Sequence, residues 1–591
     1  MAKEVSIENI RHSFAHVLAA AVKKLYPKVE LGIGPVIENG FYYDFGKVRI
    51  TDEDLPKIEA EMRKIAAGNH AFKEELWPAT KATRHFKKEN QSYKLELIRD
   101  LLKTKNSKLK TGKVGMVYIG DVFLDLCRGG HVKNTSELPL EALKLNKVAG
   151  AYWRGDEKNL MLLRVYGVAF GAKKELDEYL RLQEEAKNRD HKKLGQELDL
   201  FTFSELVGPG LPLFTPKGTI IRDLLDDFVW SLRKKHGYQK VDIPHITKKD
   251  LYERSGHWDK FKNELFRITT REGHELALKP MNCPHHIQIF SRKKWSFREL
   301  PQRYASTTKI YRDEQTGELS GLSRVRSITQ DDAHVFCNMA ATESEIKNIW
   351  EIVHEFYTAF NFPLKLRLSL RDPKQPKKYL GDSAIWKDAE AILLKVAEER
   401  KATYVTAKGE AAFYGPKLDF MATDSLSREW QVATIQLDLN MPKRFNLTFT
   451  NDQGGQSDIY MIHAAIMGSI ERFMSILIEH YAGAFPLWLA PEQIWILPVS
   501  DKFTSFARTI KQQLLEKSSV QLRAEVKEES ETLGKKIREG EIHKIPYLLI
   551  VGEREKRDNT VSVRERKKGD IGTMDLEQFA AKIEKEMQSR I

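Results

Sequence analysis

The pattern of apolar and polar residues predicts a helix near the N-terminus and another, more exposed helix further along the chain. Ile10, Phe14, Val17 and Ala21 recur at helical spacing, so we expect an amphipathic helix that buries this stripe. The segment 173–200 is strongly charged and carries Leu and Tyr at helical spacing. This second pattern is typical of an exposed helix that joins two domains.

The pattern changes twice in the second half of the chain. Apolar residues at a period of 3.6 give way to a short strand that ends at Pro244. Between 296 and 488 the strands are numerous and the turns are rich in Gly and Asp, which predicts a mostly antiparallel sheet. From residue 489 onward, strands and helices alternate, which indicates a compact α/β domain of about 100 residues.

These patterns predict an α+β multidomain protein, because a chain of 591 residues is too long for one hydrophobic core. The expected divisions are an N-terminal α/β domain, a linker helix, a domain of antiparallel sheet flanked by helices, and a C-terminal α/β domain. Their boundaries are 1–172, 173–200, 201–488 and 489–591.

Composition narrows the class of protein. There is no run of about 18 apolar residues, so we expect no membrane-spanning helix. Three cysteines cannot form a disulfide framework in a chain of this size, which indicates the reducing cytoplasm. A formal net charge of +13 favours a polyanionic partner such as a nucleic acid.

Residues 281–290, MNCPHHIQIF, place Cys283 beside His285 and His286. Spacing alone leaves open whether this is a metal site or a packed turn. In the hairpin predicted for 309–336, side chains alternate between the two faces of the return strand, so Gln330, Asp332 and His334 share one face. Around the hairpin loop, the guanidinium groups of Arg312, Arg324 and Arg326 present paired donors that suit phosphate oxygens.

A second group of metal-binding residue types lies in the N-terminal domain. His12 and His16 stand four apart on the predicted helix, and Cys127 and His131 stand four apart in DLCRGGH. By residue type the four side chains could complete a tetrahedral site. A surface helix and a glycine turn explain each pair separately, so both interpretations stay open at this point.

Several motifs together resemble class II aminoacyl-tRNA synthetases, and in particular the threonyl-tRNA synthetases of the bacterial type, from about residue 3 to residue 591. They are KPMNCPHHIQIF, YRDE, TQDDAHVF, AAFYGPKLDF, REWQVATIQLD and YMIHAAIMGSIERF. The resemblance implies ATP-dependent activation of L-threonine, transfer to the 3′ end of tRNA(Thr), and hydrolytic editing of mischarged seryl-tRNA(Thr). The three domains would then be the editing, catalytic and anticodon-binding domains.

The resemblance also implies one Zn²⁺ per subunit, held by Cys283, His334 and His463, which answers the question left open by the CPHH segment. Three ligands leave a position for the amino group and hydroxyl of threonine, beside Asp332, whereas valine has no hydroxyl to offer. Two positions depart from the family pattern. His285 replaces the common Gly, and Ile328 replaces the usual Phe, so adenine would stack on an aliphatic side chain.

By the same resemblance, ATP with Mg²⁺ would contact Arg312 at the α-phosphate, Glu314 at the adenine, Arg324 at the γ-phosphate and Arg472 from the far side. His257 of SGHWD would be the base for transfer to tRNA. The remaining residues that would line the aminoacyl-adenylate pocket are Gln330, Tyr414, Lys417, Gln431, Gln436 and Ser469.

In the N-terminal domain the resemblance assigns hydrolysis of seryl-tRNA to four residues and three helpers. Serine also carries an amino group and a hydroxyl, and one missing methyl is worth only about 1–3 kcal/mol of discrimination. A second site must therefore hydrolyse the seryl-tRNA(Thr) that forms. The site residues would be His12, His16, Cys127 and His131, with Tyr43, Lys94 and Asp125 as helpers. We expect this cluster to be metal-free. CRGGH stands where CRGPH is commoner, so Gly130 is expected to loosen the turn.

The remaining implications concern partners. Glu555 and Arg564 match positions that read anticodon bases. The helix and strand ending near Pro244 correspond to motif 1 of the class, which predicts a homodimer. The small ubiquitin-like TGS domain that often precedes the editing domain is expected to be missing.

Two other classes of protein could account for parts of this pattern. A synthetase-like RNA-binding regulator would keep the basic surface but lose the phosphate arginines or the zinc ligands, and this chain retains Arg312, Arg472 and all three ligands. A free-standing zinc hydrolase, or an editing factor that acts in trans, would explain residues 1–172 but not the 400 that follow.

Overall fold

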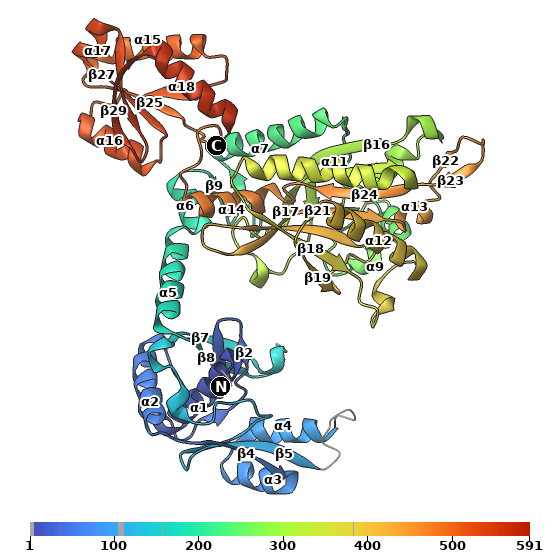
Figure 1. The fold of residues 1–591 in the computed structure, drawn as a ribbon, viewed down its shortest axis with the longest axis vertical. Coiled ribbons are helices and arrows are strands. Elements are labelled where there is room, and N and C mark those ends of the chain that lie inside the picture. Colours follow the sequence, from blue (N-terminus) through green and yellow to red (C-terminus); the bar gives the residue numbers. More distant parts are fainter. Residues whose placement is uncertain (1–4, 104–111, 157, 382, 591) are drawn as a thin grey trace. The chain divides into compact units, whose positions relative to one another are not determined.

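A computed structural model describes residues 5–103, 112–156, 158–381 and 383–590. The chain forms two compact units, Met1–Glu184 and Glu185–Ile591, and the division falls inside the predicted linker (Figure 1). Each unit is described by itself below.

The first unit contains two antiparallel sheets, of strand order β1-β3-β8-β7 with β2 on β3, and of order β4-β5-β6. Helices α1 and α2 pack on the first sheet, while α3 and α4 cover the second (Figure 1). The helices are α1 (Ile7–Leu25), α2 (Leu55–Ala67), α3 (Ala79–Lys88) and α4 (Ser92–Lys103). The strands are β1 (Glu30–Leu31), β2 (Val36–Ile37), β3 (Gly40–Gly46), β4 (Phe72–Pro78), β5 (Lys113–Ile119), β6 (Phe123–Leu126), β7 (Leu143–Tyr152) and β8 (Met161–Ala169).

Helix α1 is buried more completely than its sequence indicates. Ser6 caps its N-terminus by accepting a hydrogen bond from the backbone N–H of Asn9 at 3.2 Å. Every side chain from Ser13 to Val22 is buried, so the expectation of one buried stripe was wrong in extent. Both sheets and α2 surround the helix, and the small alanines let them approach it. His16 is therefore buried as well, although its ring lies beside the carboxylate of Asp125.

The predicted linker helix is two helices, α5 (Lys173–Asn188) and α6 (His191–Glu197). The break has a local cause: the Asp190 side chain accepts a hydrogen bond from the backbone N–H of Lys192 at 2.7 Å and caps α6. The single exposed helix expected over 173–200 was therefore wrong, and α6 packs against the core of the second unit.

The central element of the second unit is an eight-stranded sheet of order β11-β16-β17-β24-β21-β20-β18-β19. Only the β11–β16 and β18–β19 pairs are parallel, so the expected mostly antiparallel sheet is confirmed. Its strands are β11 (Gln239–Lys240), β16 (Gln302–Tyr311), β17 (Ser327–Cys337), β18 (Leu364–Leu370), β19 (Tyr404–Lys408), β20 (Lys417–Thr423), β21 (Glu429–Asp438) and β24 (Tyr460–Ala465).

Helices α7, α11 and α14 pack with this sheet in one hydrophobic core, and α7 and α11 run side by side (Figure 1). The helices of this part of the chain are α7 (Pro216–Lys235), α8 (Lys249–Ser255), α9 (His257–Lys260), α10 (Cys283–Phe290), α11 (Met339–Thr358), α12 (Ser383–Glu399), α13 (Met441–Arg444) and α14 (Ile470–Tyr481). Short ladders complete it: β9 (Phe201–Thr202) with β10 (Leu213–Phe214); β12 (Ile246–Lys248), β13 (Arg267–Thr269) and β14 (Glu275–Leu278); β15 (Trp295–Ser296), β22 (Thr448–Thr450) and β23 (Gln456–Asp458).

The C-terminal part folds as the sequence predicted, with two additions. Its sheet has the order β26-β25-β27-β28-β29, and its core is separate from that of the large sheet. The elements are β25 (Ile494–Pro498), α15 (Thr504–Lys517), β26 (Ala524–Val526), α16 (Leu533–Ile542), β27 (Tyr547–Val551), α17 (Glu553–Asp558), β28 (Thr560–Glu565), β29 (Gly569–Asp575) and α18 (Leu576–Ser589). The additions are α17, which has only six residues, and β29, whose sequence GDIGTMD is rich in Gly and Asp.

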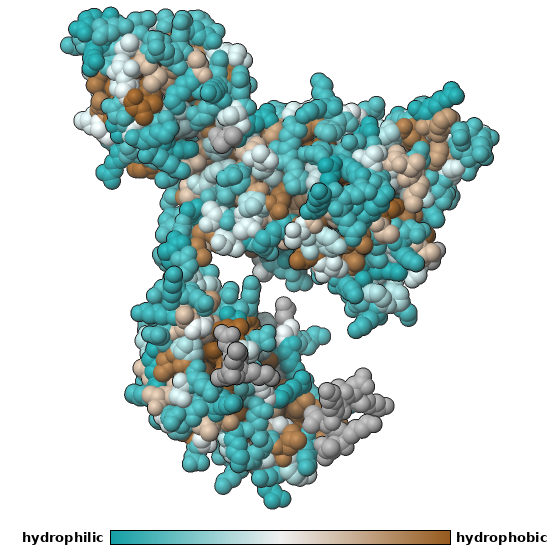
Figure 2. Space-filling model, in the orientation of Figure 1, coloured by the Kyte–Doolittle hydropathy of each residue, from teal (hydrophilic) through white to brown (hydrophobic). Residues whose placement is uncertain are grey.

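Hydrophilic residues cover most of the face shown in Figure 2. Among the described residues, no helix combines the length and apolarity needed to cross a bilayer.

Candidate active sites

One cavity of about 750 Å³ in the second unit brings together almost all the residues expected to bind ATP and threonine. It lies over the large sheet, where β17, β24, β21 and β20 present one row of side chains through the pairs His334–His463, His463–Gln436 and Gln436–Lys417. The predicted residues that line it are Arg312, Glu314, Arg324, Gln330, Asp332, Tyr414, Lys417, Gln431, Gln436, His463, Ser469 and Arg472, with Ile328 beside them.

The contacts of the Arg312 guanidinium leave one of its donors available to bind an anion. Its guanidinium lies 5.4 Å from the centre of the Phe261 ring, and its Nη2 donates to Met281 Sδ at 3.3 Å. Its Nε is buried and has no hydrogen-bond partner among the residues that the structure describes. Gln330 Oε1 in the same cavity is also buried and unpartnered. Unsatisfied buried polar atoms are costly, so this cavity is built to receive a polar ligand.

The other two predicted arginines differ in their present partners. The half-exposed Arg324 pairs with Glu314 at 2.7 Å and with Glu318 at 3.1 Å, and it must exchange these carboxylates to contact a phosphate. Arg472 lies in the first turn of α14, where Ser469 caps the helix by accepting from the Arg472 backbone N–H at 3.2 Å. Burial lowers the pKa of Arg472, whose guanidinium lies 5.7 Å from the Trp430 ring centre.

Cys283, His334 and His463 meet beside this cavity, and their candidate ligand atoms all lie within 4.8 Å of one another. His334 Nε2 and His463 Nδ1 are 3.0 Å apart and face the same point. Cys283 comes from the first turn of α10, and all three residues are buried. One thiol and two imidazoles in this arrangement fit a zinc ion with an open position.

Two residues that the sequence interpretation did not assign hold these imidazoles in place. Asp438 Oδ2 lies 3.0 Å from His463 Nε2, and His286 Nδ1 lies 2.8 Å from His334 Nδ1. Metal-binding histidines usually have such a partner on the second ring nitrogen. Asp438 ends the REWQVATIQLD motif, and that position was the only signal for it in the sequence. His286 is completely buried and bonds to Ser306 Oγ at 3.1 Å, so it is a packed residue of this site.

Asp332 lies beside this group, with Oδ1 3.8 Å from His334 Nε2. Burial raises the pKa of Asp332 to about 6, against the opposing effects of His463 and of the hydrogen bond from Asn282 Nδ2 at 3.1 Å. A carboxyl in this position can accept from an ammonium or a hydroxyl when it is ionised, and it ionises near neutral pH.

His257 does not line the cavity. It is completely buried, its Nδ1 bonds to Ser255 Oγ at 2.8 Å, and its Nε2 lies 3.8 Å from Cys283 Sγ. Burial lowers its pKa to about 3, so the ring is neutral near pH 7.

His285, the residue found where Gly is common, makes the catalytic core sensitive to acid. Both ring nitrogens are buried and have no hydrogen-bond partner in the described part of the chain, and burial lowers the pKa of His285 to about 4. Below about pH 6.5 the unfolded chain therefore binds a proton at His285, whereas the folded chain does so only near pH 4. The free energy of unfolding falls as pH falls from about 6.5 to 4. Between pH 6.5 and 5 this one residue is expected to cost about 2 kcal/mol.

The change His285→Gln is expected to remove that part of the acid sensitivity. Urea unfolding of the zinc-loaded protein, followed by tryptophan fluorescence at pH 7 and pH 5, measures it. His274→Gln, which alters an exposed histidine, is the matched control. Equal loss of stability at pH 5 in the wild type and in His285→Gln would contradict the prediction.

The second cluster, in the first unit, lies between α1 and the β4-β5-β6 sheet. Cys127 Sγ is 3.4 Å from His12 Nε2 and 3.3 Å from His131 Nε2, and it also accepts from the Gly129 N–H at 3.4 Å. Burial raises the pKa of the Cys127 thiol, but the hydrogen bonds from the surrounding histidines outweigh burial and lower it to about 3. His16 completes the group, with candidate ligand atoms within 4.8 Å.

The three predicted helpers form one buried network behind this cluster. Tyr43 donates to Asp125 Oδ2 at 2.5 Å, and the Lys94 ammonium lies 2.6 Å from Asp125 Oδ1 and donates to Tyr43 at 2.9 Å. His16 Nδ1 is 3.1 Å from Asp125 Oδ2, at ion-pair distance. Burial lowers the pKa of His16, yet Asp125 and Cys127 together raise it to about 9, so His16 is cationic near pH 7.

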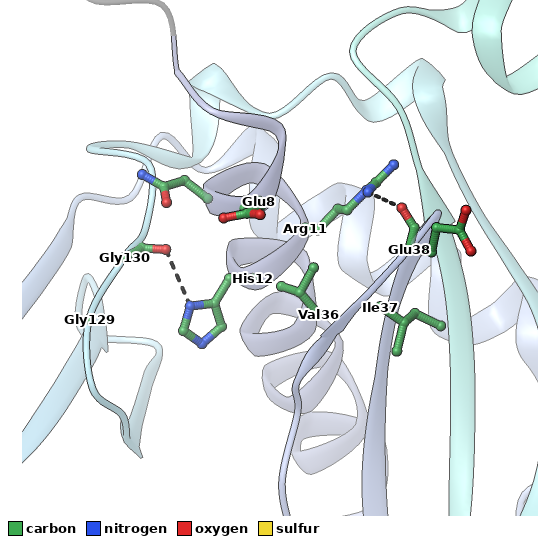
Figure 3. A pocket seen from close by; sticks show the side chains of 9 residues that line it. Glu8, Arg11, His12, Val36, Ile37, Glu38, Gly129 and Gly130 are labelled. Atoms are coloured by element: carbon green, nitrogen blue, oxygen red, sulfur yellow. Dashed lines mark hydrogen bonds between the residues drawn. The ribbon is translucent and has the colours of Figure 1, made fainter. Parts of the chain in front are cut away.

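A cavity of about 550 Å³ opens beside the cluster (Figure 3). The His12 ring points from α1 toward the loop that carries Gly130, and its Nδ1 lies 3.2 Å from the Gly130 carbonyl oxygen. Gly129 and Gly130 both have positive φ, at 96° and 94°, which a proline at 130 could not adopt. The remaining lining residues are Glu8, Asn9, Arg11, Val36, Ile37 and Glu38.

The two residues expected to read the anticodon have partners within their own domain. Glu555 accepts from the Gly552 N–H at 3.0 Å and caps α17, while Arg564 on β28 lies 3.8 Å from Glu541 and is partly exposed. Arg564 is thus free to turn toward a ligand, whereas Glu555 must leave its cap to do so.

Comparisons with known proteins agree with this architecture. The family model of the tRNA synthetase class II core domain (G, H, P, S and T) matches residues 266–481, the anticodon binding domain matches 493–586, and the threonyl and alanyl tRNA synthetase second additional domain matches 114–166. A cavity over an antiparallel sheet, lined by arginines from the β16–β17 connection and from α14, together with these matches, defines a class II aminoacyl-tRNA synthetase.

Relatives that match nearly the whole chain indicate which amino acid the enzyme uses. A threonine–tRNA ligase of Gloeobacter violaceus is 46% identical over 99% of this chain and 93% of its own, and one of Porphyromonas gingivalis is 46% identical over 98% and 88%. The chain belongs to the threonine–tRNA ligase family. It is an ATP-dependent ligase of threonine and tRNA that carries an editing domain, as the sequence predicted.

Solved structures support this placement. The RNA binding domain of threonyl-tRNA synthetase from Cryptosporidium parvum matches with a TM-score of 0.64 and 35% identity, over 67% of this chain and 98% of that chain. A putative threonyl-tRNA synthetase from Aeropyrum pernix matches with a TM-score of 0.60 and 31% identity, over 68% and 96%.

Proposed function

We propose that the ligase selects threonine with a zinc ion held by Cys283, His334 and His463, one per subunit. The observation that carries this proposal is the meeting of these three donors within 4.8 Å beside the ligand cavity. When bound, zinc supplies a Lewis-acid position that accepts the amino group and the side-chain hydroxyl of threonine together. Asp438 and His286 orient the two imidazoles, and Asp332 accepts a hydrogen bond from the amino acid.

For the nucleotide, we propose that Arg312 holds the α-phosphate, Arg324 the γ-phosphate, and Arg472 the triphosphate from the opposite side, with Mg²⁺ bound to ATP. The unpartnered Nε of Arg312 supports the first of these roles. Glu314 accepts from the adenine amino group, which requires that it release Arg324. The polar residues Gln330, Tyr414, Lys417, Gln431, Gln436 and Ser469 bind the aminoacyl-adenylate. The cations offset the negative charge that develops as pyrophosphate leaves.

We propose His257 as the base for transfer to the tRNA, on the match of the SGHWD segment. Its imidazole is neutral near pH 7, but the burial that lowers its pKa to about 3 also weakens it as a base. The ring is covered in this structure, so the step requires that the tRNA end uncover it.

We propose that the cluster of His12, His16, Cys127 and His131 hydrolyses seryl-tRNA without a metal. The cations of His16 and Lys94 balance the Cys127 thiolate and the buried Asp125 carboxylate, so the charges are already paired. Tyr43 and Lys94 fix Asp125 in this network. His12 faces the cavity of Figure 3 and is placed to accept a proton from the attacking water.

We propose further that the ligase acts as a cytoplasmic homodimer on tRNA(Thr), with Arg564 and Glu555 at the anticodon. Apolar side chains just ahead of α7 support a subunit interface at motif 1: Phe203, Leu206, Val207 and Leu213 are exposed, and Leu206 is fully so. Such a patch on a soluble surface marks an association site.

The direct test is ATP–pyrophosphate exchange by protein whose zinc content has been measured. Exchange with threonine, none with valine and about one zinc per chain would support the proposal. Two zinc ions per chain would place a metal in the N-terminal cluster and overturn the metal-free assignment. Full exchange by zinc-free protein would overturn the zinc-based selection of threonine.

A further inference from the structure

Glu74 on β4 has no role in the description above, and it touches the hydrolytic cluster from outside the cavity. Its Oε1 lies 2.8 Å from His131 Nδ1 and accepts from the Gly130 N–H at 2.9 Å. Phe72, two residues earlier on the same face of β4, stacks on the His131 ring with centroids 5.4 Å apart and planes 8° apart. One strand thus fixes both the plane and one edge of this imidazole.

Strand register explains why Glu74 reaches the cluster. Glu74 pairs with Val117 on β5, and Val117 pairs with Asp125 on β6, so the three side chains form one row on the same face of the sheet. Cys127 follows two residues after Asp125 and continues this face. The loop also comes close to the carboxylate: a Cβ on Gly129 would lie 2.6 Å from Glu74 Oε2, and the φ of 96° at this position favours glycine.

These contacts assign the ring protons. A carboxylate can only accept, so the proton of His131 that faces Glu74 must be on Nδ1. The Gly130 carbonyl can also only accept, so His12 likewise carries a proton on the Nδ1 that faces it (Figure 3). Nε2 is then the nitrogen that each ring presents to Cys127. The Gly130 peptide and Glu74 together orient the two histidines.

We propose that Glu74 is a positioning residue of the editing reaction. It holds His131 with its Nδ1 protonated and its Nε2 turned into the cluster, and it fixes the Gly130 peptide that orients His12 in the same way. The inference rests on the proposed hydrolytic role of this cluster. Glu74 does not line the cavity, so it acts on the rate of the chemical step and not on substrate binding.

The test is steady-state hydrolysis of purified seryl-tRNA(Thr) by the full-length chain carrying Glu74→Ala, Glu74→Gln or the control Glu75→Gln. Glu75 is the next residue of β4; it pairs with Lys73 and accepts from Trp77, away from the cluster. We expect Glu74→Ala to lower kcat about 10- to 100-fold with KM unchanged, the size of effect seen when a histidine loses its orienting partner. Glu74→Gln keeps an acceptor for both donors, so it should retain more activity than Glu74→Ala, while Glu75→Gln should match the wild type.

Two results would overturn the inference: Glu74 variants that match Glu75→Gln, or a raised KM with unchanged kcat, which would make Glu74 a substrate contact. An equal loss of hydrolysis in Glu74→Ala and Glu74→Gln would also contradict the inference. It would show that the glutamine oxygen, which can still accept both hydrogen bonds, does not restore activity. The hydrolytic role itself is tested separately by His131→Ala. Wild-type activity in that variant would refute the proposed site, whatever the Glu74 variants show.

Discussion

Replacing Cys283 with serine is expected to lower threonine-dependent ATP–pyrophosphate exchange by about 10³-fold or more. The reason is that the substitution removes the zinc that would bind the threonine hydroxyl, and a site built around such a contact depends on it strongly. Serine keeps the volume of the side chain but is a poor zinc ligand at neutral pH. Zinc content should fall together with activity. Both are measured on the same preparation, by metal analysis and by exchange.

Cys337→Ser is the matched control for this change. Cys337 is also buried, on β17, but its sulfur bonds to Thr342 and not to the zinc group. It should keep its zinc and its exchange activity. A Cys283→Ser protein with full zinc and full exchange would show that the amino acid is selected by another part of the cavity.

Replacing His12 with alanine is expected to make the ligase release seryl-tRNA(Thr) while it continues to make threonyl-tRNA. Removal of a general base costs about 10²- to 10⁴-fold in rate, and His12 is the cluster residue that lines the cavity. Threonylation should be unchanged, because the residues of that reaction lie in the other unit. Net formation of seryl-tRNA at excess serine and deacylation of purified seryl-tRNA measure the two effects.

His85→Ala controls for the loss of a histidine from the same unit. His85 lies on α3 against Trp77, outside the cluster. Deacylation by His12→Ala at the rate of this control would remove His12 from the proposed hydrolytic machinery.

The two sites answer two different problems of recognition. A pocket that requires a hydroxyl can reject valine strongly, whereas serine differs from threonine by one methyl group that binding can discriminate only weakly. The charges of the two sites also differ. In the second site the cations of His16 and Lys94 lie beside the Asp125 and Cys127 anions and keep the charges paired without a metal, whereas burial raises the pKa of the Cys283 thiol in the first.

The sequence predicted much of this architecture, because the signals were local. Alternation along β17 put Gln330, Asp332 and His334 on one face, and the paired strands bear this out. The alternating pattern after residue 489 gave the C-terminal sheet and its main helices. The prediction of one helix over 173–200 was wrong because Asp190 caps a second helix, α6. The amino-acid composition of the segment does not reveal such a cap.

By itself the sequence determined which residue types were available and how each was spaced: histidines one turn apart on α1, a cysteine at the start of α10, arginines around a hairpin loop. Motifs then supplied the family. Only the tertiary structure decided which side chains meet across long separations. Asp438 orients His463, His286 orients His334, and Glu74 reaches His131 over 57 residues through the register of three strands. Burial also came from the fold alone, because the layers that enclose His16 and His257 belong to distant parts of the chain, and their desolvation and charges set the two pKa values in opposite directions.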